Sequence, residues 1–421
     1  MSKLKTYKFS ELYDFSSGIS TKPEQAGHGF PFVSFSTVFN NYFLPDTLND
    51  FMDTSENERE TYSIKKGDIL LTRTSETIDE LAMSSVALKD YPNAAYSGFV
   101  KRLRPLQQDI TYDKFMGFYL RSKLFRKTMT NNAVLTLRAS LNEQIFSYLD
   151  LVLPSYVEQV KIGNLLYLLN QKIELNNKIN KELEAMAKTL YDYWFVQFDF
   201  PDENGKPYKS SGGAMKYNEE LKRELPDGWE TITLNSLLDI DTGYSFESSS
   251  YLSIGKYKII TIKNVQHNKL NTEKVDYTNE IPNNIKTTSI LNLGDILISL
   301  TGDVGRICFV NEENTLLNQR VGHIFSKDDR VDKGLIYLIM KSEMIYTKAV
   351  SIATGSNQKN LSGVDLLKLK IPFSKTPINR CSNIIKPIFL KMINLQQQNQ
   401  ELAKLRDWLL PMLMNGQVSV R

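Results

Sequence analysis

Four short polar segments carry the side chains whose chemistry is easiest to interpret. Each combines arginine, asparagine or glutamine with small residues: Arg73-Thr74-Ser75-Glu76, Leu137-Arg138-Ala139-Ser140, Leu317-Asn318-Gln319-Arg320 and Gly355-Ser356-Asn357-Gln358-Lys359-Asn360. Arginine can donate two parallel hydrogen bonds to the edge of guanine, and asparagine or glutamine can pair in the same way with adenine. The segments are therefore candidate base-reading loops, although loops rich in asparagine and glutamine also occur without such a role.

A local excess of positive charge lies between Ala94 and Arg138. This stretch holds nine basic and two acidic residues, in a chain whose net charge is only +3. Such clustering suits a phosphate backbone, because cations attract phosphates and release their counterions. A solvated helix face would carry the same charges, so both interpretations stay open. The basic residues are Lys101, Arg102, Arg104, Lys114, Arg121, Lys123, Arg126, Lys127 and Arg138.

No catalytic constellation accompanies these segments. The three histidines, His28, His267 and His323, have no cysteine or histidine at metal-ligand spacing, and we expect them on loops or on the surface. The sequence lacks both a nucleotide phosphate loop and the Asn-Pro-Pro-Tyr or Asp-Pro-Pro-Tyr motif of amino methylation of DNA bases. The segment from Thr301 to Arg306 could form a backbone nest for a phosphate, but a plain turn explains it equally well. The sequence favours a binding protein with no metal or cofactor of its own.

The elements that would hold these loops occur twice. Four matches in the same order and at similar spacing indicate an internal duplication. In each copy a Gly-Asp turn leads into a buried strand, and a later apolar strand ends at a proline. The sequence therefore predicts two similar domains of mixed α/β structure. The matching segments are Phe9–Ser20 with Leu234–Ser245, Phe32–Phe35 with Ile259–Ile262, Gly67–Leu71 with Gly294–Ile298, and Leu151–Pro154 with Leu369–Pro372.

After each proline the apolar pattern changes to heptad spacing. Apolar positions in steps of four and three run from Ile162 to Trp194 and again from Ile388 to Leu413. Asparagines interrupt both seams, and a buried amide needs a partner, so it helps to fix one pairing. We expect the two helices to form an antiparallel coiled coil, with an ordinary amphipathic helix on each domain as the alternative. The seam residues named for the coiled coil are Ile173, Asn176, Asn180, Leu183, Leu190, Leu395, Asn399, Leu402 and Leu409.

Length and composition fit this plan. The 421 residues exceed the usual size of one domain, and 41% hydrophobic and 24% charged residues are ordinary globular proportions. The predicted order is a domain at 1–154, a long helix at 155–199, a linker rich in Pro, Gly and Ser at 200–226, a second domain at 227–375 and a second long helix at 376–417. Two distant cysteines and the lack of a signal or membrane-spanning segment predict a cytoplasmic protein with reduced thiols.

Taken together, these segments resemble the specificity subunits of bacterial type I restriction–modification systems. The resemblance rests on the repeated Gly-Asp-Ile-Leu strand, the Asn318-Gln319-Arg320 tripeptide, the loop from Thr354 to Ser362, and the stretches Trp194–Pro201 and Leu225–Trp229. It covers essentially the whole chain. It implies a non-catalytic subunit in which each globular half is a target-recognition domain that reads one half of a split DNA site. The two helices would hold the domains apart and set the spacer, since the first would be roughly 60 Å long at 1.5 Å per residue.

The resemblance also implies partners. These would be double-stranded DNA, two modification subunits that methylate adenine, and ATP-dependent restriction subunits. The S-adenosylmethionine, ATP and Mg²⁺ of such a system would belong to those subunits and not to this chain. The alternatives are a methyltransferase or nuclease whose motifs have diverged, and a scaffold that binds only proteins through its coiled coil.

The DNA-facing loops are carried over from the family by position. The first domain departs from the family pattern, because Tyr96-Ser97-Gly98-Phe99 stands where the second has Asn318-Gln319-Arg320. The two domains should therefore read different half-sites. Together with the basic stretch, the residues predicted to bind DNA are Arg73, Thr74, Ser75, Lys101, Arg102, Arg121, Lys123, Arg126, Lys127, Arg138, Thr301, Arg306, Gln319, Arg320, Asn357, Gln358, Lys359 and Asn360.

Overall fold

The structure is a computed structural model that describes residues 4–135, 139–141, 143–355, 358–414 and 416–420. The chain divides into two compact units, one of residues 1–173 and 401–421 and one of residues 174–400. Each unit contains one globular domain and a segment of each long helix.

The main sheet of the first unit is antiparallel. Its strands in spatial order are β2 (Tyr13–Ser17), β9 (Val100–Pro105), β5 (Ile69–Thr72) and β7 (Ser84–Val86). A second sheet has the order β4 (Asp50–Met52), β3 (Ala26–Val33) and β8 (Ala95–Tyr96), and its β3 and β8 run parallel. Shorter pairings join β1 (Lys5–Lys8) to β12 (Asp150–Leu153), and β11 (Ala139–Ser140) to both β10 (Val134–Leu135) and β6 (Thr74–Ser75). The short helices are α1 (Phe9–Leu12), α2 (Phe35–Asn40), α3 (Glu56–Thr61), α4 (Asp113–Tyr119), α5 (Lys123–Asn131) and α6 (Glu143–Tyr148).

The second unit repeats this plan. Its antiparallel sheet has the order β16 (Leu238–Thr242), β25 (Val321–Ser326), β22 (Ile296–Ser299) and β23 (Ile307–Phe309). Its second sheet has the order β20 (Asp276–Thr278), β17 (Tyr257–Ile260), β24 (Thr315–Leu317) and β21 (Ile290–Leu291), with β17 and β24 parallel. The remaining elements are β15 (Glu230–Thr233), which pairs with β26 (Lys370–Phe373), the hairpin of β18 (Val265–Gln266) and β19 (Lys269–Leu270), and helices α8 (Lys333–Lys341), α9 (Glu343–Ile352) and α10 (Gly363–Leu367). The predicted pair of similar mixed α/β domains is confirmed.

The Gly-Asp turns explain why both copies fold alike. Gly67 and Gly294 adopt φ of 88° and 79°, a conformation that glycine adopts without strain. Each directs the following aspartate into the interior and starts a fully buried strand, β5 or β22, as the sequence predicted. The repeated motif is thus a turn and a core strand.

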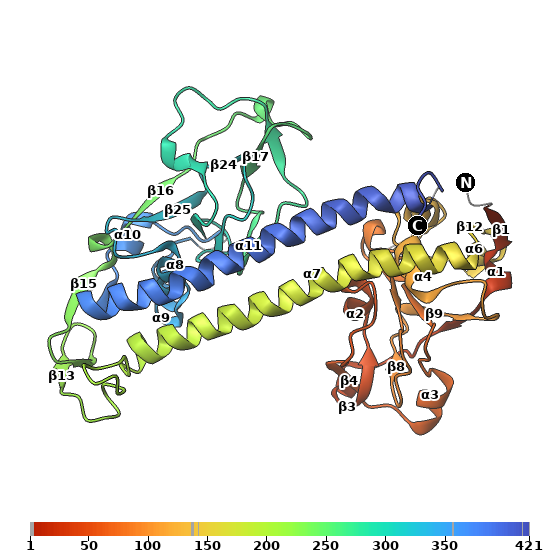
Figure 1. Cartoon of the computed structure of the whole chain (residues 1–421), viewed down its shortest axis with the longest axis horizontal. Coiled ribbons are helices and arrows are strands. Elements are labelled where there is room, and N and C mark those ends of the chain that lie inside the picture. Colours follow the sequence, from red (N-terminus) through yellow and green to blue (C-terminus); the bar gives the residue numbers. More distant parts are fainter. Residues whose placement is uncertain (1–3, 136–138, 142, 356–357, 415, 421) are drawn as a thin grey trace. The chain divides into compact units, whose positions relative to one another are not determined.

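The long helices are α7 (Tyr156–Tyr191), which continues into a π-helical turn at Asp192–Val196, and α11 (Lys375–Met414). In the second unit, Asn176 of α7 contacts Asn399 of α11, and Ala187 lies beside Ile385 and Phe389. Figure 1 shows α8 of the same unit next to α11. The rising numbers on α7 meet falling numbers on α11, so the predicted antiparallel pairing is confirmed.

The predicted seam faces inward. Asn176, Asn180 and Leu395 are buried, and the other named seam residues are half-buried. In the first unit, Ile162 and Leu166 of α7 share a core with Leu410 and Leu413 of α11. Heptad spacing therefore located the contact face correctly.

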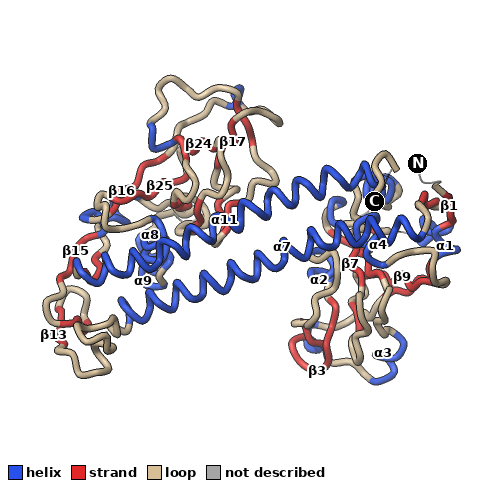
Figure 2. The backbone as a smooth tube through the Cα atoms, viewed as in Figure 1, coloured by secondary structure: helices blue, strands red, loops and turns tan. Residues whose placement is uncertain are grey.

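The segment predicted as a linker is ordered. It contains the hairpin of β13 (Met215–Asn218) and β14 (Arg223–Pro226), and Figure 2 shows these short strands among tan loops. The Phe200 ring stacks on Tyr208 with centroids 4.9 Å apart and lies 5.3 Å from Trp229. Aromatic packing and the hairpin thus give the segment between the two domains a folded structure.

No described helix combines the length and apolar character that crossing a bilayer requires.

Candidate nucleic-acid interface

In the second domain, three of the predicted loops meet at one end of the main sheet. Leu300, directly after β22, donates a backbone hydrogen bond to Arg320 at 3.4 Å and accepts one from Leu361 at 2.8 Å. The amide of Gly302 donates to the carbonyl of Lys359 at 2.8 Å. We name six exposed residues of these loops the second edge; they are Gln319, Arg320, Thr354, Gln358, Lys359 and Asn360.

The second edge carries hydrogen-bonding groups of several kinds. Arg320 offers a planar fork of donors, and the amides of Gln319 and Gln358 offer a donor beside an acceptor. The neighbouring Asn318 is buried, and its side-chain amide donates to the Tyr251 hydroxyl at 3.2 Å. The tripeptide therefore presents two exposed side chains, Gln319 and Arg320, and uses Asn318 to hold them in place.

The segment from Thr301 to Arg306 forms a turn. The amides of Gly305 and Arg306 donate to the carbonyl and the hydroxyl of Ser299, at 3.0 and 2.9 Å. The Arg306 guanidinium pairs with Asp303, with Nε 2.7 Å from the carboxylate. Thr301 is half-buried and pairs with Asn360. Because these amides are already bonded, the geometry supports the plain turn over the phosphate nest.

The first domain has a similar set of loops. The amide of Arg73, directly after β5, donates to Phe99 at 2.8 Å, and its carbonyl accepts from Leu141 at 2.9 Å. The Arg73 guanidinium donates to the Ser17 hydroxyl at 3.1 Å, and Ser75 is buried and bonded to Glu80. We name the half-buried or exposed residues of these loops the first edge; they are Arg73, Thr74, Phe99, Val134 and Ser140. The predicted residues Arg138 and Asn357 lie outside the described part of the chain.

The two edges have matching backbones. Gly98 donates to the carbonyl of Ile19, as Gln319 donates to that of Tyr244, at 2.7 and 3.1 Å. Phe99 accepts from Arg73, as Arg320 accepts from Leu300. The predicted alignment of the Ser97-Gly98-Phe99 turn with Asn318-Gln319-Arg320 is confirmed, so one scaffold displays two different sets of side chains.

Two cations of the basic stretch are buried in the first domain, and a third, Arg104, is half-buried. Lys101 has 0% of its surface exposed and Arg102 has 6%. Arg102 donates to the carbonyl of Ser63 at 2.8 Å, and Arg104 binds both carboxylate oxygens of the buried Asp68 at 2.8 and 2.6 Å. Burial places Lys101 and Arg102 out of reach of a phosphate, so we assign both to the scaffold of the domain.

Arg121 is also structural. Its guanidinium donates to the carbonyls of Ser84, Val38, Phe39 and Asn41 at 2.6 to 2.9 Å. Burial lowers the pKa of Arg121 to about 10, which still leaves it charged at neutral pH. Because Nε and Nη2 are bonded to these four carbonyls inside the domain, we assign Arg121 to the scaffold and not to a phosphate contact.

Helix α5 carries one half-buried cation, Arg126, and two exposed cations, Lys123 and Lys127. Arg126 donates to the carbonyls of Asp79 and Leu81, and burial lowers its pKa. Lys123 and Lys127 lie one turn apart and are exposed. Among the predicted cations of the basic stretch that the structure describes, these two lysines have the geometry of surface phosphate ligands. The corresponding first position of α9 is Glu343, so this feature belongs to the first domain alone.

Sequence reasoning missed the buried ionic clusters beneath both sheets. In the second domain Asp295 is held by Lys333 at 2.8 Å and lies 3.6 Å from His323. Burial opposes the charge of Asp295, but the nearby His323 and the hydrogen bonds from the Asn292 amide and Lys333 outweigh it and lower its pKa. The expectation that His323 lies on a loop or the surface is wrong, because it is buried in β25. The Gly-Asp motif was the available signal, since the aspartate follows an inward-directing turn.

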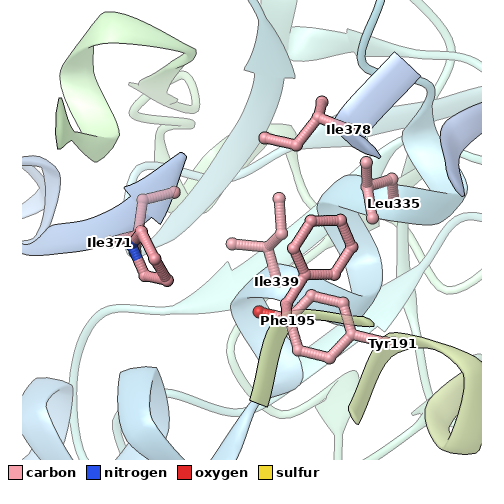
Figure 3. Close-up of a pocket in the computed structure, with 7 residues that line it drawn as sticks. Tyr191, Phe195, Leu335, Ile339, Ile371 and Ile378 are labelled. Atoms are coloured by element: carbon pink, nitrogen blue, oxygen red, sulfur yellow. The ribbon is translucent and has the colours of Figure 1, made fainter. Parts of the chain in front are cut away.

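A small cavity in the second unit is apolar. Tyr191 ends α7, and Phe195 lies in the π-helical turn that follows it. Both side chains point towards Leu335 and Ile339 of α8 (Figure 3). Ile371 and Ile378 complete the lining. Burial raises the pKa of the Tyr191 hydroxyl well above its usual value. The residues that line the cavity are aliphatic or aromatic, so the cavity is a gap in the packing of these elements and not a candidate catalytic site.

Metal and thiol chemistry find no support in the described residues. None of the described His, Cys, Asp and Glu side chains gather in groups of three or more that could hold a metal ion. Cys308 and Cys381 are free and buried, and burial raises the pKa of both thiols, that of Cys381 to about 12. Neither thiol is a reactive nucleophile at neutral pH.

These observations define a protein with two duplicated domains, each presenting a loop edge at the end of its sheet. The family model of the type I restriction modification DNA specificity domain matches residues 1–185 and 226–403. The chain therefore belongs to the family of type I restriction–modification DNA specificity subunits, as its sequence resemblance predicted. Such a subunit is the non-catalytic component that carries DNA specificity.

Known members agree over most of their length. The chain is 24% identical to the HindI specificity subunit of Haemophilus influenzae, over 98% of this chain and 99% of that one. It is 23% identical to the MjaIX specificity subunit of Methanocaldococcus jannaschii, over 84% of this chain and 78% of that one. The crystal structure of the type I restriction–modification S subunit from M. genitalium has the same fold, with a TM-score of 0.60, 16% identity, and coverage of 98% and 96% of the two chains.

Proposed function

We propose that this subunit recognises a split, asymmetric DNA target, with one domain for each half-site. The observation that carries the proposal is the pair of edges with matching backbones and different side chains. Phe99 occupies in the first edge the position that Arg320 occupies in the second. Because base recognition depends on side chains, two such edges would read two different sequences.

The proposed contacts divide by chemistry. Gln319, Arg320 and Gln358 would read base edges in the second half-site, with Lys359, Asn360, Thr301 and Arg306 beside them. Arg73, Thr74 and Ser75 would lie at the first half-site, and Lys123 and Lys127 would neutralise phosphates. Arg126 is half-buried and bonded to carbonyls, so we assign it to the scaffold. Arg138 and Asn357 remain predictions from the sequence.

The proposed partners are duplex DNA, two adenine-methylating modification subunits and the ATP-dependent restriction subunits. S-adenosylmethionine, ATP and Mg²⁺ would be bound by those subunits. The antiparallel helices would set the number of base pairs between the half-sites. With cellular DNA as its ligand, the assembly would work in the cytoplasm.

The decisive experiment is to co-express the chain with its modification subunits and to sequence the methylated adenines in the host DNA. The expected result is one bipartite motif, with two defined half-sites and an undefined spacer. A Gln358→Ala variant should relax the second half-site alone. One continuous motif, or no new methylation, would contradict the proposal. Methylation by the chain without its modification subunits would favour the alternative of a diverged methyltransferase.

A further inference from the structure

The two edges differ most at one position. Phe99 and Arg320 each accept a hydrogen bond from the residue after the central strand, Arg73 at 2.8 Å and Leu300 at 3.4 Å. The preceding turns also match, because Val100 donates to Ser97 at 2.9 Å and Val321 donates to Asn318 at 3.1 Å. Phe99 therefore occupies the backbone position that Arg320 occupies in the second domain.

The side chain of Phe99 is exposed to solvent. It is 48% exposed, although burying a phenyl group away from water would stabilise the folded protein. Among the described residues, no core cluster and no aromatic pair includes it. The packing of the folded domain therefore does not account for an aromatic side chain at this position.

The backbone that carries the ring is fixed. Gly98 donates to Ile19 at 2.7 Å, and a side chain on Gly98 would meet the Ile19 carbonyl at 3.0 Å. This close approach of two backbone segments fixes the main chain of the turn that carries Phe99. A preorganised backbone loses less entropy when the turn binds a ligand, so such a position is well suited to recognition.

A second exposed apolar side chain lies on the same edge. Val134 is 45% exposed and pairs with Ser140, and the neighbouring Leu141 donates to Arg73 at 2.9 Å. The corresponding residue of the second domain is Thr354, which pairs with Asn360. The first edge is thus apolar at two positions where the second edge is polar.

We infer that Phe99 recognises the 5-methyl group of a thymine in the major groove of the first half-site, with Val134 beside it. The inference rests on the proposed function and names the chemistry of one half of it. In the major groove, the thymine methyl is the feature that an apolar side chain can distinguish, whereas guanine and adenine present polar atoms. Arg320, at the same position of the second edge, suits guanine in the other half-site.

The test replaces single thymines by deoxyuridine, which removes the methyl group and keeps the base pair. Binding of the complex with its modification subunits is measured on duplexes that carry the motif found by methylation sequencing. We expect one deoxyuridine in the first half-site to weaken binding about three- to fivefold, as expected for one apolar methyl group. Phe99→Ala should weaken binding to the thymine duplex by a similar factor and should remove the sensitivity to deoxyuridine. Phe99→Leu should retain it.

Leu106→Ala is the matched control, because Leu106 is 57% exposed and follows the opposite end of β9. It should leave both affinity and the deoxyuridine effect unchanged. Sensitivity that persists in Phe99→Ala, or a first half-site without thymine, would overturn the inference while leaving bipartite reading intact. Increased 2-aminopurine fluorescence next to the site, lost in Phe99→Ala, would also overturn it, because it would indicate a wedge that unstacks bases. Absence of sequence-specific binding would instead contradict the proposed function.

Discussion

The side-chain amide of Asn176 on α7 donates a hydrogen bond of 2.9 Å to the side-chain oxygen of Asn399 on α11. Asn399 in turn donates to the side chain of Asn177 at 2.7 Å. Asn176 has 0% of its surface exposed, so a shifted helix pairing would bury its amide without a partner. The pair therefore favours one register between the two helices.

Replacing these asparagines should show how much the pair contributes to the stability of the folded protein. We expect Asn176→Ala to lower the free energy of unfolding by about 1–3 kcal/mol, because the side-chain oxygen of the half-buried Asn399 loses its donor. The double variant Asn176→Leu with Asn399→Leu should recover most of that loss, since apolar groups pack well in a helix seam. Urea denaturation of the whole chain measures both effects, and the single variants Asn176→Leu and Asn399→Leu complete a double-mutant cycle with the double variant.

Lys391→Ala is the control for this cycle, since Lys391 is exposed on α11. A loss in Asn176→Ala no larger than in the control would show that the pair contributes nothing to the folded state.

Arg121 and Lys123 are two residues apart and should behave in opposite ways. Arg121→Ala should destabilise the first domain by about 3 kcal/mol or more, because four carbonyl groups lose a charged donor. Lys123→Ala should leave stability unchanged, weaken binding to all DNA sequences alike and reduce the salt dependence of binding by about one unit of slope. Thermal denaturation and a salt titration of DNA affinity distinguish the two.

The informative comparison is with a variant of the second edge. Gln358→Ala should change the preference for one half-site with little effect on non-specific affinity. Equal, sequence-independent losses in Lys123→Ala and Gln358→Ala would mean that Gln358 contacts the backbone instead of a base.

The sequence predicted the Gly-Asp turns, the strands that follow them and the long helices, because each depends on residues that are close together in the chain. Gly67 and Gly294 mark turns that require positive φ, and the buried strands after them follow directly. Heptad spacing identified Asn176 and Leu395 as inward-facing, because helix periodicity depends only on the sequence itself. The loops of the second edge were predicted from their Arg, Asn and Gln side chains and from the family resemblance.

Charge could not be interpreted in the same way. Arg104 and Asp68 are separated by 36 positions in the chain, and Arg121 reaches carbonyls about 80 positions away, so no window of sequence contains both partners. A cluster of cations consequently included buried structural groups as well as the exposed Lys123 and Lys127. Phe99 was overlooked because an isolated aromatic residue suggests core until its exposure is known.

Gly18 and Gly243 make the same close approach in the two domains. A Cβ at Gly243 would lie 2.2 Å from the carbonyl oxygen of Leu317, and one at Gly18 would lie 2.3 Å from that of Tyr96. We expect Gly243→Ala to lower the stability of the second domain by about 1–3 kcal/mol or more, because backbone atoms must move. The expected readout is a lower denaturation midpoint and weaker discrimination at the second half-site, which adjoins this turn.

Gly363→Ala provides the control, because its Cβ would meet Ile240 at an ordinary 3.4 Å and lie in the first turn of α10. It should be neutral or slightly stabilising, as alanine favours a helix more than glycine does. If both glycine variants had the same effect, the close approach would not be the cause.

The buried carboxylate of Asp295 should make stability depend on acid pH. Its folded-state pKa is lowered below the unfolded value of about 3.9, because the nearby His323 and the hydrogen bonds from the Asn292 amide and Lys333 outweigh the opposing effect of burial. A group with a lowered folded pKa contributes stability above its unfolded pKa, and this contribution is lost as pH falls through the folded pKa. Urea denaturation should therefore show wild-type stability decreasing below about pH 4.

Asp295→Asn should be less stable at pH 7 and should approach the wild type at low pH, whereas the exposed control Asp227→Asn should follow the wild-type curve throughout. A constant difference between Asp295→Asn and the wild type at every pH would assign the loss to packing and not to the charge of Asp295.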